Sequence, residues 1–112
     1  MTETRDTAVY VVYVTCPAPA VASEISRTLV DEHLAACVNV VPGLQSVYHW
    51  QGQVEVDEEL LLLIKTTADR FESLKARVLT LHPDELPEIL AVRAADGLDG
   101  YLRWVKETTE PA

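Results

Sequence analysis

Three residues in this sequence have types that fit a metal site. Cys16 ends an apolar run, His82 stands directly before a proline, and Glu88 precedes another apolar run. A thiolate, an imidazole and a carboxylate together suit a borderline or soft divalent ion such as copper or zinc. Cys16, His82 and Glu88 are therefore candidate metal ligands, provided that the fold brings their three segments together.

Simpler roles are also open to these residues. A buried cysteine often behaves as a small hydrophobic side chain, and a histidine at the end of a helix can satisfy the last carbonyl groups. The second cysteine, Cys37, begins a different predicted strand and is expected to lie far from Cys16 in one subunit. Only contact between subunits could bring both thiols to one ion.

Lys65 and Trp50 are candidates for binding a small ligand. Lys65 lies near the end of a predicted strand, where its ammonium could neutralise a carboxylate or bind an anion, although lysines there usually extend into water. Trp50 lies at a predicted hairpin tip, where tryptophan more often anchors an interface. The sequence contains no nucleophile elbow, Walker loop, dinucleotide fingerprint or paired CxxC motif. We therefore expect a protein that is not an enzyme.

The elements that position these residues follow from the hydrophobic pattern. β-Branched and aromatic runs predict strands, and apolar residues spaced by three and four predict helices. The order is β-α-β-β-α-β plus a C-terminal helix, and right-handed crossovers turn it into an α+β, ferredoxin-like split βαβ fold with an antiparallel sheet. Strand 1 then lies between strands 3 and 4. The strands are predicted at 9–14, 36–41 continuing over 44–50, 53–66 and 86–94, and the helices at 20–33, 71–81 and 98–105.

The hairpin formed by the second and third strands is longer than one small domain can cover. Gln51 and Gly52 form its predicted tight turn. Its second strand would extend roughly 46 Å at about 3.3 Å per residue. Apolar side chains on such a ribbon would face water unless another subunit covered them or the ribbon frayed or folded back. We therefore predict a homo-oligomer.

Composition limits the remaining possibilities. A chain of 112 residues fits a single domain over 1–112, with a flexible N-terminus over 1–7. The formal charge of −9 disfavours nucleic acid and anionic membranes as partners. The longest apolar run, 60–64, is far too short to span a bilayer. Two cysteines outside any disulfide-rich pattern favour a cytoplasmic protein.

Several segments together resemble the CutA family of divalent-cation tolerance proteins. The resemblance spans about residues 8–107 and implies a ferredoxin-like subunit in a tight homotrimer, similar in architecture to the PII signalling proteins, with long hairpins that wrap neighbouring subunits. One departure is Asp84, which stands where the family usually has tyrosine. The matching segments are Val14-Thr-Cys-Pro17, Leu34-Ala-Ala-Cys-Val-Asn39, Pro42-Gly43, Tyr48-His-Trp-Gln-Gly52, Leu63-Ile-Lys-Thr66, His82-Pro83, Leu86-Pro-Glu-Ile89 and Tyr101-Leu-Arg-Trp104.

The resemblance implies a link to tolerance of copper or other divalent metal ions. It makes Cys16, Cys37 and His82 the candidate ligands, with Glu88 as an additional oxygen ligand. The leading hypothesis is thus a trimer that binds Cu²⁺ or a similar divalent ion in clefts between subunits. The alternative is a PII-like signalling module that binds a small anion through Lys65 and Trp50 and acts on an unidentified protein partner.

Overall fold

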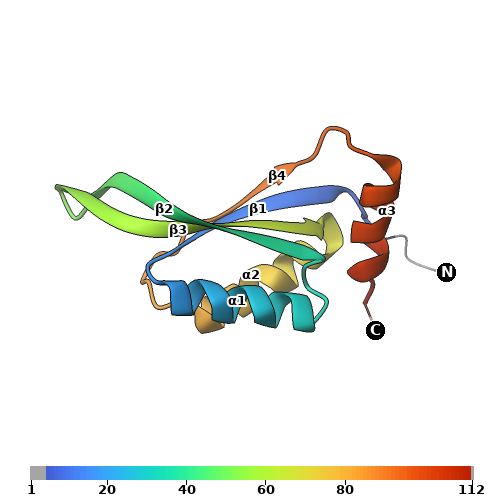
Figure 1. Ribbon diagram of the computed structural model, residues 1–112, viewed down its shortest axis with the longest axis horizontal. Coiled ribbons are helices and arrows are strands. Elements are labelled where there is room, and N and C mark those ends of the chain that lie inside the picture. Colours follow the sequence, from blue (N-terminus) through green and yellow to red (C-terminus); the bar gives the residue numbers. More distant parts are fainter. Residues whose placement is uncertain (1–4, 112) are drawn as a thin grey trace.

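The computed structural model describes residues 5–111 and confirms the predicted α+β, ferredoxin-like fold. The four strands form one sheet in the order β2-β3-β1-β4, and all three pairings are antiparallel. Helices α1 and α2 lie together on one face of the sheet, and α3 lies at one end (Figure 1). The elements are β1 (Val9–Cys16), α1 (Pro19–Asp31), β2 (Cys37–Trp50), β3 (Gln53–Thr67), a short 3-10 turn (Ala68–Arg70), α2 (Phe71–Leu81), β4 (Ile89–Arg93) and α3 (Asp99–Thr108).

The core lies between the sheet and helices α1 and α2. Because side chains alternate between the two faces of a strand, every second residue of β1 and β3 points toward the helices. Where α1 and α2 cover the sheet, these residues pack against the apolar residues of the two helices, which recur at helical spacing. The principal core residues are Val12, Val14, Cys16, Leu62 and Ile64 of the sheet, Ile25 and Leu29 of α1, and Leu74 and Val78 of α2.

The opposite side of the sheet, here termed the open face, is largely uncovered within residues 5–111. Residues that pair across antiparallel strands point to the same face of the sheet, so the strand register shows which residues lie on the open face. Leu90 and Val92 of β4 remain 56% and 46% exposed on it. Helix α3 packs against one end of this face through Val105, which contacts Val9 and Ala36. The open face comprises Cys37 and Asn39 of β2, Leu61, Leu63 and Lys65 of β3, Val11, Tyr13 and Thr15 of β1, and Leu90 and Val92.

The hairpin of β2 and β3 projects beyond the helices, as predicted (Figure 1). Its strands have 14 and 15 residues, and the molecule extends over 51 Å along one axis but only 27 and 25 Å along the others. The register shifts once, between Val41 and Leu44, where the Pro-Gly pair forms the predicted irregularity. Val47 and Val54 on the projecting arm are 62% and 61% exposed. The arm therefore presents apolar surface that its own domain does not bury.

The start of β4 differs from the prediction. The sequence suggested a strand over 86–94, but β4 spans only Ile89–Arg93. Pro87 has no N–H for the ladder and Leu86 is 75% exposed, so residues 83–88 form a loop before the strand.

Of the N-terminal residues expected to be flexible, Arg5 contacts the carboxylate of Asp69, with Nε 2.6 Å from Oδ2. Residues 1–4 lie outside the described part of the chain.

Candidate functional site

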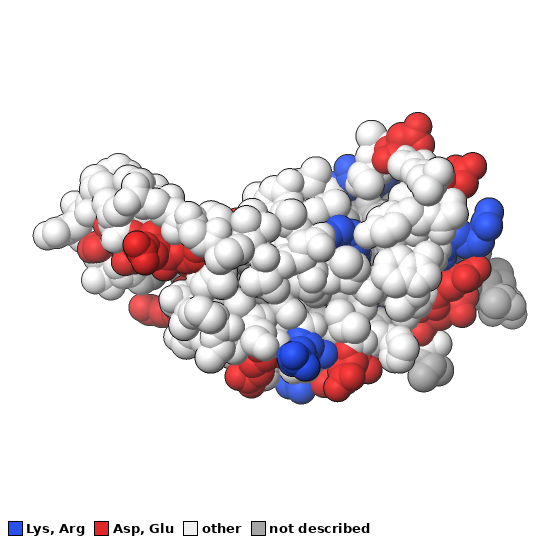
Figure 2. Space-filling model, viewed as in Figure 1, with Lys and Arg blue, Asp and Glu red and all other residues white. Residues whose placement is uncertain are grey.

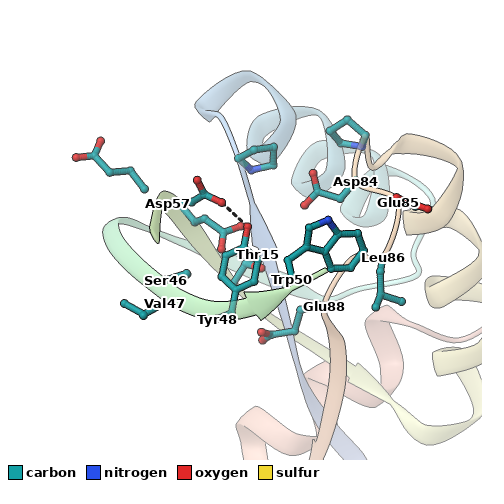
Figure 3. Close-up of a pocket in the computed structure, with 14 residues that line it drawn as sticks. Thr15, Ser46, Val47, Tyr48, Trp50, Asp57, Asp84, Glu85, Leu86 and Glu88 are labelled. Carbon is teal, nitrogen blue, oxygen red and sulfur yellow. Dashed lines mark hydrogen bonds between the residues drawn. The ribbon is translucent and has the colours of Figure 1, made fainter. Parts of the chain in front are cut away.

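A groove of about 880 Å³ lies between the hairpin arm and the loop 83–88 (Figure 3). Thr15, at the end of β1, forms part of its floor, so the groove continues the open face of the sheet. Six carboxylates line it and no lysine or arginine does, and we term it the acidic groove. The carboxylates are Asp57, Glu58, Glu59, Asp84, Glu85 and Glu88.

The acidic groove lies in a strongly acidic part of the molecule. The sequence has no lysine or arginine over 28–64 or 78–92, the segments that supply all but two of the groove's residues. On the face drawn in Figure 2, the arm shows acidic but no basic side chains, whereas the rest of this face shows both. Such a field attracts cations and repels anions.

Two neighbouring groups respond to this field. A hydrogen bond from the Tyr48 hydroxyl to Asp57, aided by desolvation and by the nearby carboxylates, raises the pKa of Tyr48 to about 12. Burial, followed by the negative charges of Glu59 and Asp84, raises the pKa of Cys16 to about 11. The negative charges of the groove carboxylates thus add to the effect of the hydrogen bond on Tyr48 and to the effect of burial on Cys16.

The predicted ligands Cys16, His82 and Glu88 do come to the same end of the sheet. His82 contacts the backbone of Thr15, the residue before Cys16, and Glu88 lines the groove together with Thr15. Cys16 itself is fully buried on the helix side of β1 and does not line the groove. Within residues 5–111, no group of three or more His, Cys, Asp or Glu side chains is placed to hold a metal ion.

The His82 side chain is completely buried and both of its ring nitrogens are hydrogen-bonded. Nε2 lies 2.7 Å from the Thr15 carbonyl oxygen, to which it donates, and Nδ1 accepts the backbone N–H of Asp84 at 3.1 Å. A metal ligand needs a free nitrogen lone pair, so ligation by His82 would require one of these bonds to break.

Cys37 and Lys65 lie together at the other end of the open face. Cys37 pairs with Lys65 across β2 and β3, whereas Cys16 pairs with Leu60, five positions away along β3 or about 17 Å. Trp50 pairs with Gln53, which is twelve positions or about 40 Å from Lys65. One subunit therefore brings together neither the two thiols nor the two candidate ligand-binding residues.

The sequence reasoning missed most of the acidic groove. Of the groove's lining, only Glu88 and Trp50 were predicted as candidate site residues, whereas the other five carboxylates and the Tyr48 hydroxyl were not. Trp50 lines the groove with Leu86, and the arm and loop face each other across it (Figure 3). The usable signal was the acidic run 55–59 together with the long stretch lacking basic residues.

These features define a small α+β domain with a projecting hairpin and a groove lined by carboxylates. The chain belongs to the CutA1 divalent ion tolerance protein family, whose model matches residues 10–108. It is 54% identical over 99 residues to the divalent-cation tolerance protein CutA of Thermus thermophilus, covering 88% of this chain and 96% of the relative. A solved structure of the Cut A1 protein from Thermus thermophilus superposes with a TM-score of 0.90 at 53% identity, covering 91% of this chain and 99% of that one.

Relatives from other organisms can be longer. Protein CutA, chloroplastic, of Arabidopsis thaliana is 44% identical over 99 residues, covering 88% of this chain but 54% of the relative, so the chain spans about half of that protein. The family description refers to tolerance of divalent ions and names no reaction. No helix within residues 5–111 is long and apolar enough to cross a membrane.

Proposed function

We propose that this protein binds Cu²⁺ or a similar divalent ion as part of the response to metal ions, and that it does so as a cytoplasmic homotrimer. The observation that carries the proposal is the acidic groove, in which six carboxylates face one cavity without a basic residue among its lining. For sites built from nitrogen and oxygen donors, Cu²⁺ binds most tightly of the first-row divalent ions. The names of the family and of its relatives support a cation as the ligand.

The donor set favours loose rather than tightly chelated binding. The groove carboxylates do not converge on one point within the described chain, so an ion would keep part of its hydration shell or take further ligands from another subunit. The thiol of Cys16 is buried and its pKa is raised, and the nitrogens of His82 are occupied. Thiol and imidazole ligation by these residues would therefore require local rearrangement.

Two apolar surfaces support assembly into an oligomer. The open face leaves Leu90 and Val92 about half exposed, and the arm exposes Val47, Val54 and Val56 by more than half. Contiguous apolar surface of this kind marks protein interfaces. Sedimentation in dilute, metal-free buffer should give about 37 kDa, three times the 12.4 kDa chain. A stable folded species of 12.4 kDa would contradict the trimer.

Calorimetric titration with Cu²⁺ tests the metal-binding proposal. The triple variant Glu58→Gln, Asp84→Asn, Glu85→Gln removes three groove charges and should weaken binding at least about tenfold, because local charge sets the attraction. The matched variant Glu24→Gln, Asp31→Asn, Glu107→Gln removes three exposed charges outside the groove and should change it less than about twofold. Absence of saturable uptake by the wild type would contradict the proposal.

A companion titration separates carboxylate from thiol and imidazole ligation. The variant Cys16→Ser, Cys37→Ser, His82→Gln, which keeps a hydrogen-bonding side chain beside the groove loop, should retain copper binding if the groove carboxylates hold the ion. Loss of binding in that variant, with the groove triple variant unaffected, would instead assign the ion to the thiols and the imidazole. Circular dichroism of each variant checks that the fold is intact.

The second candidate function, a PII-like module that binds a small anion, rests on Lys65. Its Nζ donates to Asn39 Oδ1 and to the Leu63 carbonyl oxygen, which are both neutral acceptors. Trp50 and Lys65 are about 40 Å apart along β3, so a ligand that contacts both requires two copies of the chain. A rise in melting temperature with a small anion, insensitive to chelators, would favour this candidate.

A further inference from the structure

The ammonium of Lys65 lacks a counter-charge in an apolar environment. Lys65 lies on the open face, paired with Val11 of β1, which in turn pairs with Val92 of β4. Its two acceptors, on Asn39 and Leu63, are uncharged. No carboxylate of residues 5–111 forms an ion pair with it. Lys65 therefore enters any interface formed by this face as an uncompensated positive charge.

Covering the open face would make that charge costly. Burial of an ammonium without an opposite charge is strongly unfavourable, and this cost would offset much of the gain from burying the surrounding apolar side chains. Lys65 is already half-buried in the isolated chain. The surface that covers the open face must therefore bring a carboxylate or another anion to Nζ.

Glu88 has the complementary properties. Its side chain lines the acidic groove, is exposed and forms no ion pair within the described residues. Glu88 directly precedes β4 and lines the acidic groove together with Thr15 of the open face, so it lies at the edge of that face. It is also surrounded by five other carboxylates, and a neighbouring cation would relieve their mutual repulsion.

Lys65 and Glu88 cannot meet within one copy. Lys65 is level with Val92 in the sheet, and Glu88 lies four positions before Val92, or about 13 Å along the strand direction. One strand, β1, also lies between the strand of Lys65, β3, and β4, which Glu88 precedes. The two groups therefore belong to opposite ends of the same face.

We propose that Lys65 of one copy forms an ion pair with Glu88 of the next copy. Such a contact joins two different surfaces, and head-to-tail contacts of this kind close into a ring when the rotation permits. The cleft between copies then combines Lys65, Asn39 and Cys37 of one chain with the acidic groove of the other. This inference rests on the proposed homotrimer and specifies which groups meet in it.

Charge reversal tests the pair in metal-free buffer containing EDTA. By sedimentation, Lys65→Glu and Glu88→Lys should each raise the dissociation constant of the assembly at least about tenfold, because like charges then face each other. The double variant should return it to within about threefold of the wild type. Arg27→Glu and Glu24→Lys, which make the same charge changes on the exposed side of α1, should have no effect.

A cross-linking experiment does not depend on whether these variants fold. A carbodiimide couples an amine to a carboxylate in direct contact and forms an amide, the water being taken up by the reagent. In an equal mixture of ¹⁵N-labelled and unlabelled wild-type chains, assembled from dissociated subunits, mass spectrometry should find Lys65 joined to Glu88 in peptides of mixed label. Its absence from assembled protein would overturn the pair.

The outcomes separate this inference from the proposals on which it rests. Unchanged assembly in both single variants, with a wild-type mass near 37 kDa, would reject the ion pair and leave the trimer. A monomeric wild type would reject both the ion pair and the trimer. The copper-binding proposal would still be tested independently by titration of the groove variants. Binding of inorganic phosphate that Lys65→Glu abolishes, without any effect on assembly, would assign Lys65 to a ligand and also overturn the pair.

Discussion

The imidazole Nε2 of His82 lies 2.7 Å from the carbonyl oxygen of Thr15 and joins the end of α2 to the end of β1. On its other side, Nδ1 accepts the N–H of Asp84, the second residue of the groove loop. One fully buried side chain thus fixes the loop 83–88 against the strand that carries Thr15. This arrangement assigns His82 a structural role in holding one wall of the acidic groove.

Replacement of His82 should therefore destabilise the fold. His82→Ala leaves the Thr15 carbonyl and the Asp84 N–H without their partners and removes a buried ring, which should lower the free energy of unfolding by about 2 to 4 kcal/mol. Urea denaturation measures this change. His49→Ala, on the exposed arm, is the matched control and should stay within about 0.5 kcal/mol of the wild type. Equal stabilities of the two variants would contradict the structural role.

The buried thiol of Cys16 should make stability fall at alkaline pH. Its pKa is about 11 in the folded chain, against an ordinary value of 9.0. Between these values the unfolded chain releases a proton that the folded chain retains, so this contribution is complete below pH 9 and is lost as the pH rises to 11. In Cys16→Ala, the free energy of unfolding should decline less steeply over this range. Parallel declines in denaturation series would contradict the assignment.

Asp69 should contribute stability that is lost in acid. Burial favours its neutral form, but hydrogen bonds from Arg5 and Thr67 outweigh burial and hold its pKa below the ordinary 3.8. The contribution is therefore complete above about pH 4 and is lost as the pH falls through the lower, folded-state pKa.

The variant Asp69→Asn tests this acid dependence. It should be about 1 to 3 kcal/mol less stable at neutral pH, because hydrogen bonds to a charged group are lost, and it should lose part of the wild type's acid dependence. The exposed change Asp31→Asn serves as the control in the same denaturation series. An Asp69→Asn curve that parallels the wild type down to pH 2 would be inconsistent with the ion pair to Arg5.

The hairpin turn should tolerate change at one position only. Gly52 has φ +79° and nothing within 4 Å of an added Cβ, so Gly52→Ala should lower stability by about 1 kcal/mol through backbone strain alone. Gln51, at φ 48°, already adopts the left-handed conformation, and Gln51→Asn should cost nothing because asparagine favours it. Amide hydrogen exchange at the tip should rise in Gly52→Ala only. Faster exchange in Gln51→Asn would contradict this turn assignment.

The sequence was sufficient to predict most of the fold because its apolar periodicities are regular. Residue types within each element determine its structure. Examples are the strand that contains Val12 and Val14, the helical spacing in α1 and the Gln51-Gly52 turn. The predicted start of β4 at Leu86 was wrong because an apolar leucine resembles a strand residue. In the structure Leu86 is exposed, Pro87 follows it, and both lie in the loop before β4.

The candidate site was only partly predictable. Topology alone predicts that Cys16, His82 and Glu88 share one end of the sheet. The hydrogen bonds that occupy both nitrogens of His82 depend on side-chain placement that no spacing reveals. The acidic groove forms because the arm lies close in space to a loop that is far from it in the sequence. Its carboxylates are therefore recognisable as one site only in the folded chain.

The arm also has a consequence for the newly made chain. Its outer strand, β2, is at the edge of the sheet and carries unpaired backbone groups beside exposed valines, which is the surface that promotes aggregation. The seven acidic residues of the arm and the groove loop oppose indiscriminate pairing, since two bare arms repel each other. The carboxylates of the acidic groove thus protect the arm from aggregation during synthesis, and neutralising them should reduce the soluble yield on expression.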